Sequence, residues 1–313
     1  MKKLLAVLVL AIALIVSCTK AENADIDGLK IVAVDFPSYD AVRAILGSDK
    51  EVSMLLPPGS ESHSYEPTAK DMIEISNADL VVFAGGASDE WVHTILDSLD
   101  NPVPHFALMD YVDLYEEEYI EGMEHDHEHE EEHDHEHEAF DEHVWTSPIN
   151  EIKIIKALTE ALSDIVPDRK EELIENSNSY IKQLEYLDSE FRALFEKSSI
   201  KTMIFASRFP LRYFVEEYGL EYYAAFPGCA EESEPSARTI AFLIDKVRDE
   251  NLGYVFNIEF GSPMIASVIA SESGAEVREF HTVHNLTAID FANNETYISL
   301  MERNLEVLKE VFL

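Results

Sequence analysis

The chain has 313 residues, of which 62 are Asp or Glu and only 23 are Lys or Arg, so its formal net charge is −39. Binding to nucleic acids or to anionic lipid surfaces needs clusters of Lys and Arg, which this sequence lacks. We therefore exclude nucleic acid as a partner and expect an acidic surface that attracts cations.

The N-terminal segment has the pattern of a bacterial lipoprotein signal. Two lysines and an apolar run over residues 4–16 precede Cys18, and this run is too short to span a bilayer stably. We expect residues 1–17 to be the signal peptide and Cys18 to be the lipidated first residue of the mature chain. Residues 18–24 would then be a tether, so that the protein is extracytoplasmic and held at a membrane by lipid alone.

Residues 25–166 are predicted to form an N-terminal α/β lobe. Four short apolar runs bounded by Pro, Gly or Asp have the composition of buried parallel strands. Helical patterns lie between the first and second runs and between the second and third. The four runs are Leu29–Val34, Val52–Leu56, Leu80–Ala84 and Val103–Leu108. This alternation predicts a mainly parallel four-stranded sheet flanked by helices.

An acidic, histidine-rich loop is predicted over residues 116–138. Its six histidines alternate with Asp and Glu, and imidazole and carboxylate groups are common ligands of zinc and related ions. The segment has no apolar periodicity, so it cannot bury enough surface to offset the entropy of ordering. We expect a mobile loop that binds additional metal ions weakly. The histidines are His125, His127, His129, His133, His135 and His137.

A long helix is predicted after the loop, over residues 167–198. Apolar residues from Leu173 to Leu194 recur at intervals of three and four, which gives one continuous apolar stripe. About 30 helical residues extend over roughly 45 Å, which is longer than one small lobe is wide. We therefore expect this helix to be a rigid link between two lobes.

Residues 199–313 are predicted to form a second lobe of the same α/β class. The predicted strands are Thr202–Ala206, Tyr222–Phe226, Tyr254–Glu259 and Glu276–Phe280. Helical segments separate them, and a last helix from about Asn293 to Val311 closes the chain. The expected fold is thus two similar α/β lobes joined by one long helix, in a monomer.

Three histidines lie where a predicted strand or loop ends. His63 follows the run Val52–Leu56, His143 follows the acidic loop, and His281 comes directly after Glu276–Phe280. Ligands of open α/β sheets bind beyond the carboxyl ends of the strands. A single histidine in such a place is more often structural than a ligand, but three equivalent positions predict a metal site in the cleft between the lobes.

Several motifs, in the same order along the chain, closely resemble those of the zinc and manganese solute-binding proteins of bacterial ABC importers. The motifs are Pro57-Pro58-Gly59 with His63-Ser64-Tyr65-Glu66-Pro67-Thr68, His143-Val144-Trp145-Thr146-Ser147-Pro148, Tyr213-Phe214 with Tyr218-Gly219-Leu220, Glu234-Pro235-Ser236, and Ile269-Ala270 with Gly274-Ala275. The resemblance covers essentially the whole mature chain. It implies one divalent metal ion in the cleft, delivery to an ABC transporter permease, and no enzymatic activity.

The resemblance also implies a ligand set, from which this sequence departs. The N-terminal lobe is expected to supply His63 and His143, whereas the position of the third ligand falls on Arg208, which cannot coordinate a metal. The fourth ligand position falls on His281. We therefore predict a variant with three histidines. Glu259 or Glu234 is expected either to pair with Arg208 or to be a fourth ligand.

Three neutral imidazoles favour zinc, with manganese as the alternative, because manganese prefers more oxygen donors. Water or a carboxylate would complete a tetrahedral shell. A secreted zinc hydrolase that uses a metal-bound water is an alternative function, although the sequence has no His-Glu-x-x-His helix. A stand-alone metal buffer is another. Once Cys18 is lipidated, Cys229 has no partner for an intrachain disulfide, and its role stays open.

Overall fold

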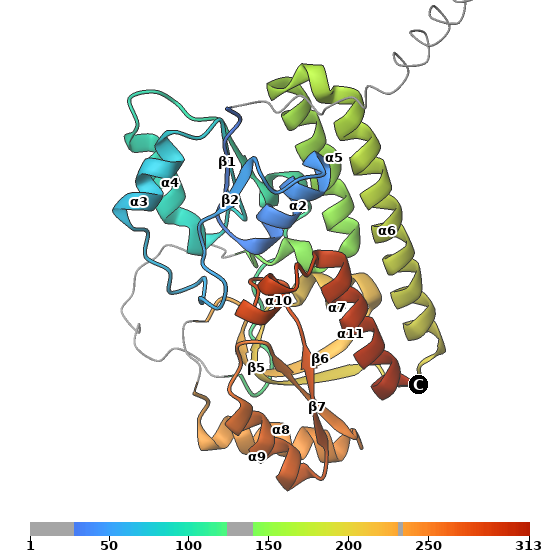
Figure 1. Ribbon diagram of the computed structural model, residues 1–313. Helices are drawn as coiled ribbons and strands as arrows, with labels where there is room; N and C mark the ends of the chain where they lie inside the picture. The colour runs from blue at the N-terminus through green and yellow to red at the C-terminus, as the bar shows by residue number, and fades with distance from the viewer. Residues whose placement is uncertain (1–27, 124–139, 231–233) are drawn as a thin grey trace, which may run out of the picture.

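The computed structural model describes residues 28–123, 140–230 and 234–313, which form two α/β lobes beside a long helix (Figure 1). The predicted signal peptide, Cys18 and the six histidines from His125 to His137 lie outside the described residues. Within the described ranges, none of the helices combines the length and the apolar character that crossing a membrane requires.

The N-terminal lobe contains a parallel sheet with the strand order β2-β1-β3-β4. Its strands are β1 (Ile31–Ala33), β2 (Val52–Met54), β3 (Leu80–Phe83) and β4 (His105–Ala107). Its helices are α2 (Phe36–Leu46), α3 (Ala69–Ser76), α4 (Glu90–Ser98) and α5 (Pro148–Ile165), with 3-10 turns at Ala87–Asp89, Leu108–Tyr111 and Val144–Thr146. Figure 1 shows α3 and α4 on one face of this sheet and α2 and α5 on the other.

Alternate side chains of the two central strands serve the two faces of this sheet. Ile31 and Leu80 belong to the core that includes α2 and α5, whereas Val32 and Val81 pack with residues of α4. Because both faces are covered, these strands are apolar throughout, and this property made them recognisable in the sequence.

The C-terminal lobe repeats this architecture with the strand order β6-β5-β7-β8, again all parallel. Its strands are β5 (Thr202–Phe209), β6 (Glu221–Pro227), β7 (Tyr254–Ile258) and β8 (Glu276–Phe280). Its helices are α7 (Arg212–Tyr218), α8 (Ala237–Asp249), α9 (Pro263–Ser273), α10 (Ala288–Ala292) and α11 (Tyr297–Phe312). In Figure 1, α8 and α9 cover one face of the sheet and α11 lies on the other. The predicted fold class is confirmed.

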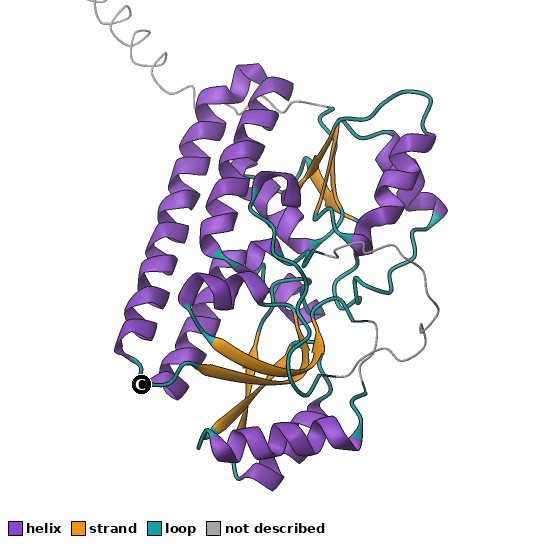
Figure 2. Cartoon of the chain, turned by 180° about the vertical axis from the view of Figure 1, so that it is seen from behind, coloured by secondary structure: helices purple, strands orange, loops and turns teal. Residues whose placement is uncertain are grey.

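The link between the lobes is α6 (Lys170–Lys197), which follows a 3-10 turn at Pro167–Arg169. Its 28 residues correspond to roughly 42 Å of helix. Its predicted apolar stripe is buried, from Leu173 to Leu194. The helix contacts α2 and α5 of the N-terminal lobe and α11 of the C-terminal lobe, and Figure 2 shows it running beside α5 and on towards the second sheet.

A segment of the N-terminal lobe crosses to the C-terminal lobe before the histidine-rich part of the chain. The side chain of Thr239 on α8 donates to the carbonyl of Gly122 at 3.1 Å. Gly122 has a φ of +93°, and a Cβ atom there would lie 2.1 Å from the ring of Phe242. Phe140 then pairs antiparallel with Glu116. Gly122 therefore lies against α8 and Phe140 beside Glu116.

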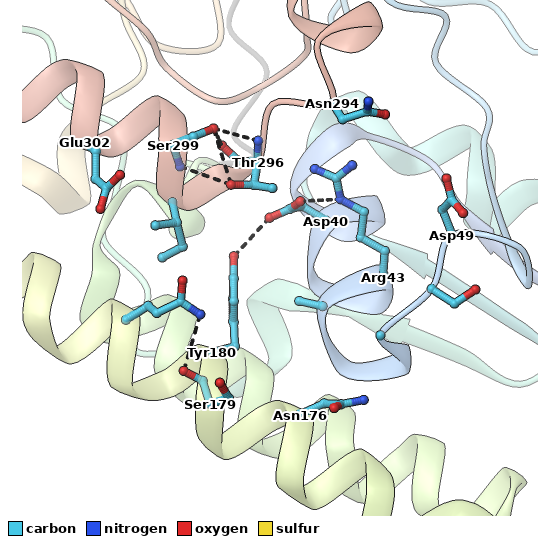
Figure 3. A pocket seen from close by; sticks show the side chains of 15 residues that line it. Asp40, Arg43, Asp49, Asn176, Ser179, Tyr180, Asn294, Thr296, Ser299 and Glu302 are labelled. Carbon is cyan, nitrogen blue, oxygen red and sulfur yellow. Dashed lines mark hydrogen bonds and ion pairs between the residues drawn. The ribbon is translucent and has the colours of Figure 1, made fainter. Parts of the chain in front are cut away.

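A buried carboxylate connects the two lobes to the linking helix. Asp40 of α2 accepts hydrogen bonds from the hydroxyl of Tyr180 on α6 and from the backbone N–H of Tyr297 on α11, both at 3.0 Å. Arg43 donates to the same carboxylate at 2.6 Å and also to the carbonyl of Glu295. Figure 3 shows Asp40, Arg43 and Tyr180 beside an open groove of about 750 Å³. Asp40 therefore fixes three elements at once.

Asp40→Ala is expected to lower the free energy of unfolding by about 3 kcal/mol, because it leaves Arg43 and two buried donors without their acceptor. Tyr180→Phe removes one of these hydrogen bonds and is expected to cost only about 1 kcal/mol. Urea unfolding monitored by circular dichroism measures both values. Equal stability of Asp40→Ala and the parent would show that the carboxylate does not hold the lobes.

Candidate metal centre

Four donor side chains from both lobes meet in one place. They are His63, Glu142, His143 and His284, and one donor atom of each lies within 4.8 Å of the other three. The imidazole centroids of the three histidines are 5.1 to 5.4 Å apart. His143 and Glu142 are at most 1% exposed, and His284 is 8% exposed. Such a group has the residue types and the compactness of a metal site.

His143 is oriented by the carboxylate of Asp141. One oxygen of Asp141 accepts from the backbone N–H of His143 at 2.8 Å and lies 2.9 Å from its Nδ1. Because a carboxylate only accepts, Nδ1 carries the proton and Nε2 is left as the acceptor. Nε2 is buried and has no hydrogen-bond partner among the described residues. Buried polar atoms are normally satisfied, so this nitrogen is free for a ligand.

Glu142 is held by the loop that follows β3. Its two carboxylate oxygens accept from the hydroxyl of Ser88 at 2.6 Å and from the backbone N–H of Ser88 at 3.1 Å. A Cβ atom at Gly86 would lie 2.1 Å from the same carboxylate, so the close approach needs glycine. Oε1 of Glu142 is 3.4 Å from Nδ1 of His63. Our sequence analysis missed Glu142, for which the only signal was its position beside His143.

Burial keeps two of the histidines neutral. Burial, followed by the charge on His143, lowers the pKa of His63 to about 4. The same two causes hold the pKa of His284 well below its usual value. For His143, burial also disfavours the charged ring, but the carboxylates of Asp141 and Glu142 outweigh it, so its pKa is raised. At neutral pH, His63 and His284 are therefore unprotonated, as metal ligands must be.

The histidine that joins the group from the C-terminal lobe is His284, which differs from the predicted His281. His281 lies at the end of β8 as expected, but its backbone N–H and C=O bond the side chain of Asn304 at 2.8 and 2.7 Å. Its Nδ1 accepts from the N–H of Val283 at 3.0 Å. Val283 has a φ of 62°, a left-handed turn that is rare for a β-branched residue. This turn brings position 284, rather than 281, to the group.

Arg208 pairs with a different carboxylate from the two that we had predicted. Its guanidinium forms an ion pair with Glu61, from the N-terminal loop that also carries His63, and donates to the carbonyl of Ala230 at 3.1 Å. Glu259 instead accepts from the N–H and the hydroxyl of Thr282, at 2.9 and 2.6 Å. Glu234 is exposed. Neither Glu259 nor Glu234 belongs to the group of four donors.

A small cavity adjoins the histidines. It has a volume of about 20 Å³ and is lined by residues of both lobes that include His63, Arg208, Glu259 and His284. This volume holds roughly one water-sized species. The cavity can thus hold one small ion but no large organic ligand.

Cys229 also lies outside the donor group. Burial raises the pKa of its thiol, and its backbone N–H donates to Glu117 at 2.8 Å.

Two α/β lobes joined by one long helix, with a buried group of imidazole and carboxylate donors where they meet, define a two-lobed solute-binding protein. Residues 31–311 match the family described as "Zinc-uptake complex component A periplasmic" (ZnuA), and the chain belongs to this family. This confirms the resemblance found in the sequence. The family is described as a component of zinc uptake, which is not an enzymatic role.

Two relatives illustrate the similarity in sequence. The zinc-binding lipoprotein AdcA of Streptococcus pneumoniae serotype 4 is 33% identical over 313 residues, which covers 99% of this chain and 61% of AdcA. The high-affinity zinc uptake system protein ZnuA of Bacillus subtilis is 32% identical over 291 residues, which covers 92% of this chain and 88% of that protein. The chain thus spans about three fifths of the length of AdcA.

Two crystal structures share the fold. The Zn(II)-bound ZnuA-like domain of S. pneumoniae AdcA has a TM-score of 0.74 and 29% identity, over 91% of this chain and 98% of that one. The metal-dependent lipoprotein YcdH of B. subtilis has a TM-score of 0.75 and 29% identity, over 91% of this chain and 99% of that one. Both similarities extend across the two lobes and the linking helix.

Proposed function

We propose that this protein captures one zinc ion outside the cytoplasm and delivers it to the permease of an ABC transporter. The observation that carries the proposal is the buried group of His63, Glu142, His143 and His284, with Nε2 of His143 left without a protein partner among the described residues. The family, and relatives whose names include zinc binding and zinc uptake, support the same function.

The donor set favours zinc over manganese. Three imidazole nitrogens and one carboxylate oxygen can supply the four ligands of a tetrahedral zinc site, whereas manganese prefers six ligands that are mostly oxygen. The hydrogen bond from His143 to Asp141 is the usual way to orient a zinc-bound imidazole and to increase its basicity. We therefore propose His284, in place of the predicted His281, as the third histidine ligand and Glu142 as the fourth ligand.

A hydrolytic function receives less support from the same geometry. A zinc hydrolase needs an open coordination position and space for its substrate. Here four protein donors can fill a tetrahedral shell, and the adjoining cavity of about 20 Å³ has no room for an ester or a peptide.

We propose that the histidines from His125 to His137, outside the described residues, bind further ions weakly and so raise the local metal concentration.

The ligand assignment is tested by alanine substitution. His63→Ala, His143→Ala and His284→Ala are each expected to weaken zinc binding by more than about 100-fold, because each removes a donor. His281→Ala should keep one tight site, since His281 supports the turn at Val283 without joining the donor group. Competition with a chromophoric chelator measures the affinities. Retention of the tight site in His284→Ala and its loss in His281→Ala would restore the sequence-based assignment.

The pH dependence of zinc binding should have two stages. His143, with its raised pKa, carries a proton at mildly acidic pH that zinc must displace, so affinity should fall about tenfold per pH unit there. His63, with a pKa of about 4, should add a second proton only near that pH. Titrations between pH 4 and 8 measure the slope. Asp141→Asn, the matched control, should move the first stage to lower pH, whereas a slope near three from pH 6.5 downwards would contradict the assignment.

Delivery to a permease is tested in cells. Deletion of the gene in its host should abolish growth under zinc chelation, and growth should return with the parent gene or with added zinc. A His143→Ala gene should fail to restore growth, because the captured ion is the cargo. The control is Asn176→Ala, a substitution on α6 outside the donor group. Unimpaired zinc accumulation in the deletion strain would instead favour a stand-alone metal buffer.

A further inference from the structure

The loops that carry His63 and His284 are joined by a buried side-chain amide. Asn285 is 1% exposed, and its Nδ2 donates to the carbonyls of Pro57 and Ser60, at 2.9 and 2.8 Å. Its Oδ1 accepts from the N–H of Leu286 at 2.8 Å. Because two carbonyls face one end of the amide, that end must be the NH₂ group. Asn285 thus uses both donors on the N-terminal lobe.

A backbone hydrogen bond completes this junction between the lobes. The N–H of Gly59 donates to the carbonyl of Leu286 at 2.7 Å. Close by, the hydroxyl of Ser62 lies 3.3 Å from Nδ1 of His284. The junction therefore connects residues 57–62 of the N-terminal lobe with residues 284–286 of the C-terminal lobe. None of these contacts uses the nitrogen of His143 that is free for a ligand.

The C-terminal side of the junction is held by several hydrogen bonds. Asn304 of α11 bonds both backbone groups of His281, and Glu259 bonds the backbone and the hydroxyl of Thr282. These contacts lie directly before Val283, whose left-handed φ of 62° is costly for valine and persists only where neighbours enforce it. Because Asn304 and Glu259 hold the turn before Asn285 in place, the two hydrogen bonds of Asn285 act on the position of the loop that carries His63.

This geometry has a consequence for ion release. An ion bound by His63 and His284 would lie between donors of different lobes, so it could leave only when these donors separate. The junction resists that separation whether or not an ion is present. It should therefore act mainly on the dissociation rate, which is where most differences in affinity between related complexes arise.

We propose that Asn285 is a positioning residue that latches the His63 loop to the His284 loop and so sets how long a captured ion is retained. The proposal rests on the metal-binding function proposed above. In transport, the event that releases the ion must break this latch.

The kinetic test uses Asn285→Ala in the full chain. Loss of two hydrogen bonds of typical net strength should raise the zinc dissociation rate by about 10- to 30-fold, while one tight ion still binds, because every ligand remains. Asn285→Asp has nearly the same volume but cannot donate, so it should release zinc at least as fast as Asn285→Ala. Stopped-flow mixing with a chromophoric chelator measures the rates.

Asn176→Ala is the matched control. Asn176 also donates from a side-chain amide to a backbone carbonyl, that of Ile45 at 3.0 Å, but it is only partly buried and does so between α6 and α2 beside the groove in Figure 3. Its loss removes one hydrogen bond between two elements and should leave the zinc dissociation rate unchanged. A dissociation rate in Asn285→Ala equal to that of the parent would overturn the latch while leaving the proposed function intact.

Hydrogen exchange tests the latch without metal. Pro57 and Pro58 have no amide hydrogen, so exchange in a peptide that begins at Pro57 and ends at Ser60 reports mainly on Gly59 and Ser60. The Gly59 amide should be protected in the metal-free parent and lose this protection in Asn285→Ala. Rapid exchange in the parent would overturn the latch. A parent that is protected but binds no zinc would instead refute the proposed function.

Discussion

The candidate metal centre depends on the burial of ionisable groups where the two lobes meet. Away from water, an imidazole resists protonation and a carboxylate resists ionisation unless a partner compensates. The histidines His63 and His284 are accordingly held neutral, and burial raises the pKa of Asp35, whose charge interacts with that of Glu142, to about 6. A divalent cation would lower the free-energy cost of this burial, because it is coordinated by neutral imidazole nitrogens and its charge stabilises the ionised form of nearby carboxylates.

The donors can be close only because the scaffold brings two lobes together in a fixed arrangement. Glu142 and His143 lie at the start of the region that leads into α5, which packs against α6, whereas His284 follows β8 in the other lobe. Asp40 ties both lobes to α6 through buried hydrogen bonds, and Asn285 ties the ligand loops to each other. The scaffold thus sets the distances between these donor side chains.

Arg208 stands at the position where the family resemblance implies a third ligand. Its positive charge is compensated by a residue from the same loop as His63. A guanidinium next to a cation site would repel the ion, but Glu61 pairs with it. Although burial disfavours the charged form of Glu61, Arg208 lowers its pKa. The C-terminal lobe contributes no donor from this position, and Glu142 of the N-terminal lobe joins the group instead. Three of the four donor side chains therefore come from the N-terminal lobe.

The sequence by itself determined the fold class, the eight strands to within a few residues, the linking helix and the loops in which His63 and His143 lie, because these follow from local apolar periodicity and from motifs. Only the tertiary structure decided which histidine after β8 reaches the group, which acid pairs with Arg208, and that Glu142 joins the donors. A left-handed turn at Val283 and contacts between residues far apart in the chain control these choices. Such contacts leave no periodic signal in the sequence, since they depend on how the two lobes pack together.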